Sequence, residues 1–404
     1  MRIAIINMIP YGSTGKIMLQ LADVARNNGF NVKTYSTKPF DKKAKKVVSD
    51  LKDHFEWGSV AENKRHYYLG SLLGRNGCFS HRGTRQLIKD LEKFSPDIVH
   101  LHNLHKFCIN LPILFKYLKK KNLKIFWTLH DCWAFTGQCP YFDMVGCEKW
   151  KTGCYKCAQL KSYPKSYIDR SKSMYKLKQK WFNGAKDLTI VTPSNWLYEL
   201  VKQSFLKDYP VKVINNGINL SVFKPTQSEF RGKYGIGDNK FVLLGVAFGW
   251  GERKGLDVFI ELSERLSDDF QIVLVGTDDN VDKQLPKNII SIHRTQNQSE
   301  LVEIYSSADL FVNPTREDNF PTVNIESLAC GTPVITFRTG GSPEIIDETC
   351  GCVVDKNNVN AMEKEIIRIK EEKPYSKEAC LKRANNFDMN EKFAEYVKLY
   401  EDEE

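Results

Sequence analysis

The sequence has 404 residues, of which 42% are hydrophobic and 27% are charged. This length suits two domains of about 200 residues each, and the composition is that of a folded protein and excludes an intrinsically disordered one. No uninterrupted run of about 18 apolar residues is present that could cross a bilayer, and the short apolar N-terminus does not have the pattern of a signal peptide. We therefore expect a cytoplasmic protein.

Charge is divided unevenly along the chain. Residues 1–207 hold 36 Lys and Arg against 15 Asp and Glu, a net charge of +21, whereas the remaining residues hold 23 against 34, a net charge of −11. A basic first half indicates an anionic partner, which can be lipid phosphate at a membrane surface or nucleic acid. A merely solvated basic surface is the alternative.

The first half alternates between strand and helix patterns. Residues 2–8 form an apolar run, and the turn Pro10-Tyr-Gly-Ser-Thr-Gly15 leads into apolar residues at helical spacing. Further strands are expected at 97–101, 124–129 and 188–191, and further helices at 111–118 and 196–201. Such alternation predicts a parallel sheet covered by helices on both faces.

A domain boundary is expected near residues 207–225, where the charge changes sign and turn residues interrupt the pattern. Strands follow at 241–247, 271–275, 289–292, 310–312 and 334–337, with helices at 256–266, 299–306 and 323–330. The sequence therefore predicts two doubly wound, Rossmann-like α/β domains, at 1–207 and 208–380. A C-terminal helix at 381–404 is expected to pack back on the first domain.

The segment 314–333, PTREDNFPTVNIESLACGTP, carries three acids, Glu317, Asp318 and Glu326, around the start of a predicted helix. It resembles the paired-acid signature of glycosyltransferase family 4, in which two glutamates precede a small-residue helix and a Gly-Thr-Pro turn. The resemblance implies that Glu326 holds both ribose hydroxyls of a nucleotide sugar. Asp318 stands where the family has its first glutamate, so either the donor sugar sits differently or Glu317 assists.

The residues between these acids are expected to bring backbone close to the donor's sugar and phosphates. They are Asn319, Phe320, Pro321 and Thr322. The alternative for each acid taken singly is a solvated residue at the start of a helix.

The loop 249–255, GWGERKG, resembles the family's donor-phosphate loop. The resemblance implies that Gly249 lies near the donor and that Lys254 stabilises the diphosphate as it leaves. The family's arginine stands five or six residues before the lysine, where this chain has Phe248 and Gly249, and Arg253 is the candidate replacement. Because side chains neutralise the diphosphate and no Asp-x-Asp pair is present, no catalytic metal is expected.

Two features of the first half match parts of the same family. Gly12, Ser13 and Gly15 correspond partially to a glycine pair that lets backbone approach the donor phosphate. A plain helix start, capped by Ser13 or Thr14, is the alternative. His130 matches a family histidine that approaches the donor sugar.

Other residue types with metal-binding chemistry also occur in the first half. The strand pair His100 and His102 lacks the further ligands of an open metal site, and His100 is expected in the core. Four cysteines with the spacing x7, x6 and x2 lie in the loop 132–160, and they suit a structural zinc site. They are Cys139, Cys147, Cys154 and Cys157. The alternative is unligated thiols packed among aromatic side chains.

Nearly the whole chain resembles the branch of family 4 that serves bacterial colanic-acid-like exopolysaccharide synthesis. The resemblance implies a GT-B fold, two Rossmann-like domains facing each other across a cleft, and retaining transfer of a hexose from a nucleoside diphosphate sugar. The implied acceptor is an oligosaccharide, either soluble or linked to a lipid diphosphate at the inner face of the cytoplasmic membrane. Lysines expected to meet anionic lipid there are at 42, 43, 45, 46, 119, 120 and 121.

Two other functions are open to the sequence. A nucleotide-sugar epimerase can share the two-domain architecture and would bind the same donor. A nucleic-acid-binding protein would account for the basic first half and the cysteines but leaves the paired acids unexplained. We therefore expect no nucleic acid partner.

Overall fold

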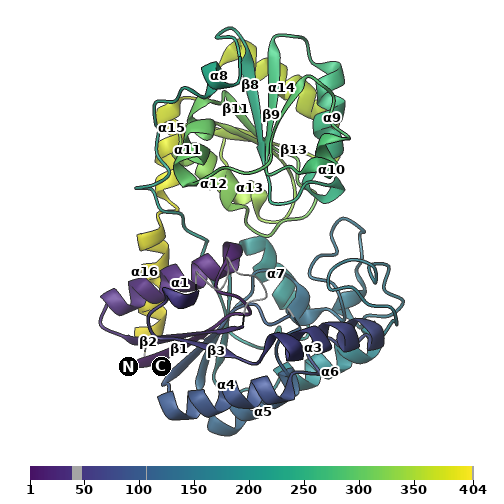
Figure 1. Cartoon of the computed structure of the whole chain (residues 1–404), viewed down its shortest axis with the longest axis vertical. Coiled ribbons are helices and arrows are strands. Elements are labelled where there is room, and N and C mark those ends of the chain that lie inside the picture. The colour runs from purple at the N-terminus through teal and green to yellow at the C-terminus, as the bar shows by residue number, and fades with distance from the viewer. Residues whose placement is uncertain (39–47, 106, 403–404) are drawn as a thin grey trace. The chain divides into compact units, whose positions relative to one another are not determined.

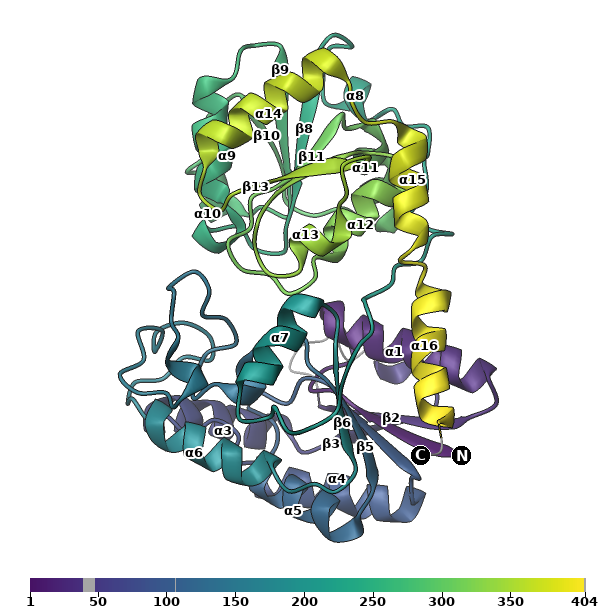
Figure 2. The same ribbon diagram turned by 180° about the vertical axis from the view of Figure 1, so that it is seen from behind.

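The computed structural model describes residues 1–38, 48–105 and 107–402 and divides into two compact units (Figures 1 and 2). The first contains Met1–Ile214 and Phe393–Glu404, and the second contains Asn215–Lys392. The first unit extends beyond the predicted end at residue 207 because β7 (Val211–Val213) adds an edge strand to its sheet. None of the described helices is long and apolar enough to span a bilayer.

The first unit is built on a seven-stranded sheet with the order β3-β2-β1-β4-β5-β6-β7, in which all neighbouring strands are parallel. Besides β7, the strands are β1 (Arg2–Ile6), β2 (Asn31–Thr37), β3 (His54–Trp57), β4 (Ile98–Leu101), β5 (Lys124–Thr128) and β6 (Leu188–Thr192). The order reverses between β1 and β4. Parallel sheets bind ligands beyond the carboxyl ends of their strands at such a point.

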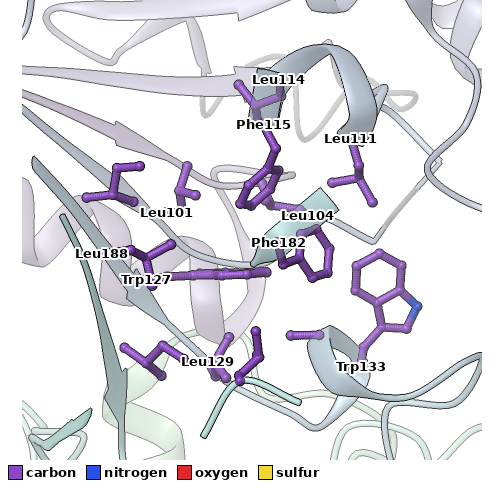
Figure 3. Close-up of a cluster of buried hydrophobic side chains, with 14 of the residues drawn as sticks. Leu101, Leu104, Leu111, Leu114, Phe115, Trp127, Leu129, Trp133, Phe182 and Leu188 are labelled. Carbon is purple, nitrogen blue, oxygen red and sulfur yellow. The ribbon is translucent and has the colours of Figure 1, made fainter. Parts of the chain in front are cut away.

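Helices cover both faces of this sheet (Figure 1). They are α1 (Gly12–Asn27), α3 (Val60–Leu73), α4 (His81–Phe94), α5 (Leu111–Lys121), α6 (Ser171–Phe182), α7 (Asn195–Gln203) and α16 (Met389–Glu401), with the 3-10 turns η1 (Trp133–Phe135) and η2 (Lys149–Lys151). On one face Phe115, Trp127 and Phe182 pack with ring centroids 4.6–5.4 Å apart (Figure 3). On the other, Tyr396 and Tyr400 of α16 are buried.

The C-terminal segment forms two helices where the sequence predicted one at 381–404. The first, α15 (Lys377–Asn385), belongs to the second unit, whereas α16 belongs to the first unit from Phe393 onward. Between them the chain is held by Ile218, which donates its N–H to the carbonyl of Phe387 at 3.0 Å and accepts from the N–H of Met389 at 2.9 Å. These backbone bonds interrupt the helical ladder and set the break.

The second unit is built on a six-stranded parallel sheet with the order β10-β9-β8-β11-β12-β13. Its strands are β8 (Phe241–Val246), β9 (Phe270–Val275), β10 (Ile289–Ile292), β11 (Leu310–Asn313), β12 (Val334–Phe337) and β13 (Gly351–Val354). Its helices are α8 (Phe230–Lys233), α9 (Leu256–Arg265), α10 (Asp279–Asp282), α11 (Gln298–Ser307), α12 (Thr322–Ala329), α13 (Ser342–Ile345), α14 (Val359–Glu372) and α15, with the 3-10 turn η3 (Glu252–Lys254). The order reverses between β8 and β11.

Candidate functional site

The two loops at the reversal point of the second sheet are held against each other. Gly255 has a φ of +75°, and a Cβ there would lie 2.5 Å from the carbonyl oxygen of Pro314, so glycine is required for this approach. The backbone N–H of Arg316 donates to the carbonyl of Arg253 at 2.9 Å. The loop after β8 and the acid segment, residues 314–321 after β11, therefore form one site.

Arg316 anchors the acid segment to the start of α9. Its guanidinium donates to both carboxylate oxygens of Asp257, at 2.7 and 2.6 Å, and to the side-chain oxygen of Asn357 at 2.6 Å. Burial works against ionisation of Asp257, but the bonded guanidinium outweighs it and lowers the pKa of this carboxyl. The sequence analysis gave Arg316 no role, although an arginine beside two acids is a signal for such a pair.

Lys254 and Asp318, predicted to serve the diphosphate and the sugar respectively, are paired with each other. The Lys254 ammonium lies 2.5 Å from Asp318 Oδ2, and the two side chains are only 16% and 19% exposed. Asp318 Oδ1 accepts from the backbone N–H of Asn319 at 2.9 Å. The site thus holds a cation and an anion whose charges compensate each other.

A glycine turn after β12 fixes the backbone around Asp318. Gly340 has a φ of +54°, and a Cβ there would lie 1.7 Å from the carbonyl oxygen of Asp318. The N–H of Gly341 donates to the carbonyl of Asn319 at 2.7 Å. The sequence analysis did not single out this turn, because its partner lies about 20 residues away in the chain.

Arg253, the candidate replacement for the family's arginine, donates from Nη1 to the carbonyl oxygen of Glu317 at 3.1 Å. Glu317 is buried, with 5% of its surface exposed. Arg253 therefore braces the acid segment in this structure. Gly249 adopts a φ of +86° with open space around its Cβ position, which leaves room beside the loop.

Glu326 lies inside α12, where the hydroxyl of Tyr305 donates to its Oε2 at 3.2 Å. Tyr305 is fully buried, and burial followed by the Glu326 charge raises its pKa, so it remains a hydroxyl donor. Below them the amides of Asn313 and Asn324 are bonded at 2.7 Å. Sequence reasoning found Glu326 but not the tyrosine that orients it.

The residues between Asp318 and Glu326 start α12 at the carboxyl edge of the sheet. Asn319 and Phe320 are buried, Pro321 is the residue before the helix, and Thr322 is its first residue. No side chain caps this helix start. Uncapped N–H groups at a helix N-terminus favour an anion.

In the first unit, the turn after β1 leads into α1 at Gly12. Gly15 has no space for a side chain, because a Cβ there would lie 2.5 Å from the carbonyl carbon of Pro10. Neither Ser13 nor Thr14 caps the helix: the preceding residue is Tyr11, with no side-chain capping bond. Glycine at 15 thus serves close packing of the turn.

His130 follows β5 and is bonded to a second histidine. Its Nε2 lies 2.9 Å from Nδ1 of His102, and the two rings are stacked. Burial lowers the pKa of His130 to about 4, although the Asp131 charge acts in the opposite direction. His130 is therefore a neutral imidazole near neutral pH, and His100 is a core residue, bonded to Thr128 and Tyr400.

A chain of hydrogen-bonded side chains, buried at His105 and Asp131, was not predicted from the sequence, although its members flank predicted residues. His105 Nε2 lies 2.9 Å from Asp131 Oδ2, and His105 Nδ1 lies 3.0 Å from the hydroxyl of Tyr163. Burial opposes ionisation of Asp131, but His105 outweighs it and the pKa of Asp131 is lowered. The chain links the loops after β4 and β5 to the segment that follows the cysteines.

The four cysteines lie in one loop between β5 and α6. The thiols of Cys139 and Cys157 are hydrogen-bonded, and this bond is the main cause that lowers the pKa of Cys157 to about 7. Among the described residues, only Asp279, Asp282 and His293 bring three potential ligand atoms within 4.8 Å of one another, so no three of the four sulfurs do. The zinc site therefore remains a prediction.

The lysines expected to meet lipid are only partly described. Those at 42, 43, 45 and 46 lie outside the described residues. Lys119, at the end of α5, donates to the carbonyls of Lys180 and Asn183 at 3.3 and 2.5 Å. It therefore joins α5 to α6, and this accounts for its side chain without lipid.

Each of the two units matches a known family model. Residues 14–222 match the family model Glycosyltransferase Family 4, and residues 239–372 match the model Glycosyl transferases group 1. A putative colanic acid biosynthesis glycosyl transferase, WcaC of Escherichia coli, is 27% identical over 65% of this chain and 65% of its own length. A Campylobacter jejuni N,N'-diacetylbacillosaminyl-diphospho-undecaprenol alpha-1,3-N-acetylgalactosaminyltransferase is 27% identical over 63% of this chain and 72% of its own length.

Solved structures share the fold over almost the full length. Sucrose-phosphate synthase from Thermosynechococcus elongatus matches with a TM-score of 0.73 at 18% identity, covering 99% of this chain and 98% of its own. Anabaena HepE in complex with UDP matches with a TM-score of 0.69 at 14% identity, covering 99% and 100%. The predicted GT-B fold class, with two parallel-sheet α/β domains, is confirmed.

Proposed function

Since the chain belongs to glycosyltransferase family 4, we propose that it moves a hexose-type sugar from a nucleoside diphosphate sugar to a saccharide acceptor with retention of configuration. The acceptor we propose is an oligosaccharide linked to a lipid diphosphate. We propose that this reaction is a step of bacterial surface polysaccharide synthesis, and the similarity to WcaC supports this.

The arrangement of Glu326, Lys254 and Asp318 at the carboxyl edge of the second sheet carries the proposal. Glu326 is oriented by Tyr305 and offers a carboxylate that can accept both ribose hydroxyls. Lys254 presents a cation at the N-terminus of α9, next to the uncapped start of α12. A nucleoside diphosphate needs this combination of an acceptor for its ribose and positive charge for its phosphates, and the UDP complex of HepE supports such a donor.

The transfer breaks the bond between the anomeric carbon and the diphosphate and forms one from that carbon to an acceptor hydroxyl oxygen. In the proposed retaining route the leaving phosphate oxygen takes the acceptor's proton on the same face, so no side-chain nucleophile is needed. Lys254 and Arg253 stabilise the charge that grows on the diphosphate. His130, which is neutral, offers a hydrogen bond to a sugar hydroxyl.

We assign the membrane contact to a surface of the first unit. Large exposed apolar side chains lie on α3 and on residues 163–168, which are joined by the bond from Tyr167 N–H to the carbonyl of Ser71 at 2.9 Å. They are Tyr67, Tyr68, Leu72, Leu73, Tyr163, Tyr167 and Ile168. Tyrosines beside exposed Lys161 and Lys165 suit the headgroup region of an anionic membrane. The Campylobacter relative's name, which includes an undecaprenol diphosphate, supports the lipid-linked acceptor.

A thermal-shift screen of UDP-, GDP- and ADP-sugars with the full chain tests the donor, because a ligand that binds only the folded protein raises Tm. We expect stabilisation by at least one nucleotide sugar and its loss in Glu326→Ala. Incubation of that donor without acceptor separates the alternatives: an epimerase converts the sugar, and a transferase at most hydrolyses it slowly. Absence of stabilisation by every donor together with salt-sensitive oligonucleotide binding would overturn the proposal.

A further inference from the structure

The cysteine loop surrounds a cavity that the proposed transfer reaction does not use. The cavity has a volume of about 520 Å³ and is lined by Cys139, Cys147 and Cys157 together with other residues of the same loop, whereas Cys154 is not part of the lining. Cys139 is buried, and the other two are half-buried. Three of the four predicted ligands therefore face one space.

Two backbone N–H groups point at sulfur atoms in this loop. The N–H of Gly137 donates to Sγ of Cys154 at 3.1 Å, and the N–H of Gln159 is bonded to Cys157. Such bonds stabilise a negatively charged sulfur more than a thiol, because the donor dipole is aimed at the charge. They are the supporting contacts that metal thiolates use in proteins.

A buried lysine is connected to the same sulfur. Lys178 on α6 is 1% exposed, and its ammonium donates to the carbonyls of Trp133 and Thr136 at 2.7 and 3.0 Å. The carbonyl of Thr136 and the N–H of Gly137 belong to one peptide group, so this group connects the ammonium to the sulfur of Cys154. Within the described part of the chain, Lys178 has no ion pair with a carboxylate.

Burying an ammonium without an ion-pair partner costs free energy. The neighbouring groups with the largest electrostatic effect on Lys178 are thiols. Burial lowers the pKa of Lys178 to about 7, and negative charge on Cys154, Cys139 and Asp131 acts in the opposite direction. Four thiolates around one divalent cation carry a net charge of −2. Such a cluster would add to the negative charge of Asp131 and favour the protonated form of Lys178.

We propose that Cys139, Cys147, Cys154 and Cys157 bind one structural zinc ion, with Lys178 as the buried counter-ion of the cluster. Zinc takes four thiolates in a tetrahedron with Zn–S distances of about 2.3 Å, which closes the site to substrate and gives it a structural role. Cys139 and Cys157 already touch, so Cys147 and Cys154 are the ligands that move.

The loop backbone allows Cys147 and Cys154 to move, and it has an uncommon conformation at one residue between Cys154 and Cys157. Gly146 and Gly153 have positive φ and no atom within 4 Å of a Cβ position, so the turns next to Cys147 and Cys154 can adjust. Lys156, inside the Cys154–Cys157 turn, has a φ of +44°, which is uncommon for a residue with a side chain. This tight turn suits two ligands with two residues between them.

The test is the zinc content of the full chain, expressed with zinc and purified under reducing conditions without chelator. We expect about one zinc per chain, bound with a tetrahedral thiolate set. Cys147→Ser and Cys154→Ser should each lose most of it, and Lys178→Met should weaken zinc affinity about tenfold through loss of the neighbouring charge. Cys352→Ser in the second unit, another half-buried thiol, should keep zinc at the wild-type content.

Should a serine variant fail to fold, Co²⁺ reconstitution of the wild type decides instead, because tetrahedral cobalt thiolates absorb strongly in the visible region. Wild-type protein without bound zinc, or without these bands, overturns the proposal. So does a protein that contains no zinc and has a Cys139–Cys157 disulfide by mass spectrometry, since this result assigns the pair to redox chemistry. Donor binding by the second unit is measured in parallel, so the outcome for zinc is independent of the proposed transferase function.

Discussion

Replacement of Glu326 by glutamine is the sharpest perturbation of the proposed donor site. Glutamine keeps the length and shape of the side chain but has one acceptor oxygen where the carboxylate has two. In Glu326→Gln the amide nitrogen can face either Tyr305 or the ribose, so the variant cannot keep the tyrosine contact and two ribose contacts together. The expected change is a loss of nucleotide affinity without a loss of fold.

The size of the loss follows from the contacts. A hydrogen bond to a charged group contributes about 1.5–3 kcal/mol, and losing one of the two ribose bonds therefore weakens binding about 10- to 150-fold. Tyr305→Phe is the matched second variant, because it removes only the donor at 3.2 Å and leaves the carboxylate. Its expected loss is about 0.5–1.5 kcal/mol, or about 2- to 12-fold.

The assay is isothermal titration calorimetry with the nucleoside diphosphate of the donor that stabilises the wild type best, with UDP measured first. Thermal unfolding of both variants serves as the control for fold. An unchanged Kd in Glu326→Gln, with an unchanged Tm, would refute the assignment of Glu326 to ribose. A Tyr305→Phe loss larger than that of Glu326→Gln would also contradict it, because the tyrosine acts only through the carboxylate.

Other changes test the rest of the site and the fold. Lys254→Ala should lower kcat more than it raises nucleotide Kd, as steady-state kinetics and calorimetry can separate, because its charge matters most as the diphosphate leaves. Asp318→Asn should tighten nucleoside diphosphate binding about fivefold in the same titration, because the partly buried ion pair contributes about 1 kcal/mol to holding Lys254 away from phosphate. The same variant should have a lower turnover. Gly340→Ala should destabilise the chain by more than about 2 kcal/mol in urea unfolding, through positive φ and the clash at the carbonyl of residue 318, whereas Gly232→Ala, with open space, should not. Burial lowers the pKa of His100 from its ordinary 6.5 to about 3, so below pH 6.5 the unfolded state binds a proton that the folded state does not. The free energy of unfolding therefore falls by about 1.4 kcal/mol per pH unit as the pH drops below about 6.5. His100→Gln should make the fall of Tm with acidification shallower.

The pattern of apolar residues in the sequence correctly predicted strands that are buried on both faces, because such strands are nearly continuous apolar runs. β4 and β11 have no exposed residue and were predicted to within a residue or so. The edge strand β3 and the helix α3 were not predicted. In α3 the buried residues are Glu62, Asn63, His66, Gly70 and Ser71, while its large apolar side chains face outward, so the usual apolar stripe is absent.

For the site, the sequence identified the residues that we propose to act on a ligand but not the residues that hold them in place. Glu326, Lys254 and Asp318 belong to contiguous motifs, and the structure places them at one sheet edge. Arg316 and Tyr305 act through partners 59 and 21 residues away, at Asp257 and Glu326. Such pairings depend on strand order, which a single sequence does not reveal before the fold is known.

The Lys254–Asp318 pair explains why an aspartate can stand where the family has glutamate. Two charges this close, 2.5 Å apart and mostly shielded from water, leave little free positive charge in the site until a competing anion arrives. In the proposed donor site, a diphosphate that takes Lys254 would remove the cation from Asp318 and leave its carboxylate free to accept from a sugar hydroxyl. On this proposal, occupancy of the phosphate subsite would control the acceptor strength of the sugar subsite, and the donor would be recognised through both parts at once.

A shorter side chain favours this coupling. Asp318 is held by the N–H of Asn319 and by the turn at Gly340, so its carboxylate cannot follow Lys254 toward the phosphates. A glutamate has an additional rotatable bond and could keep the ion pair as the lysine moves. If Lys254 and Asp318 serve the donor as proposed, the departure from the family pattern would fix the distance between the phosphate and sugar subsites, and the donor sugar would have to match that distance rather than the one set by the usual glutamate.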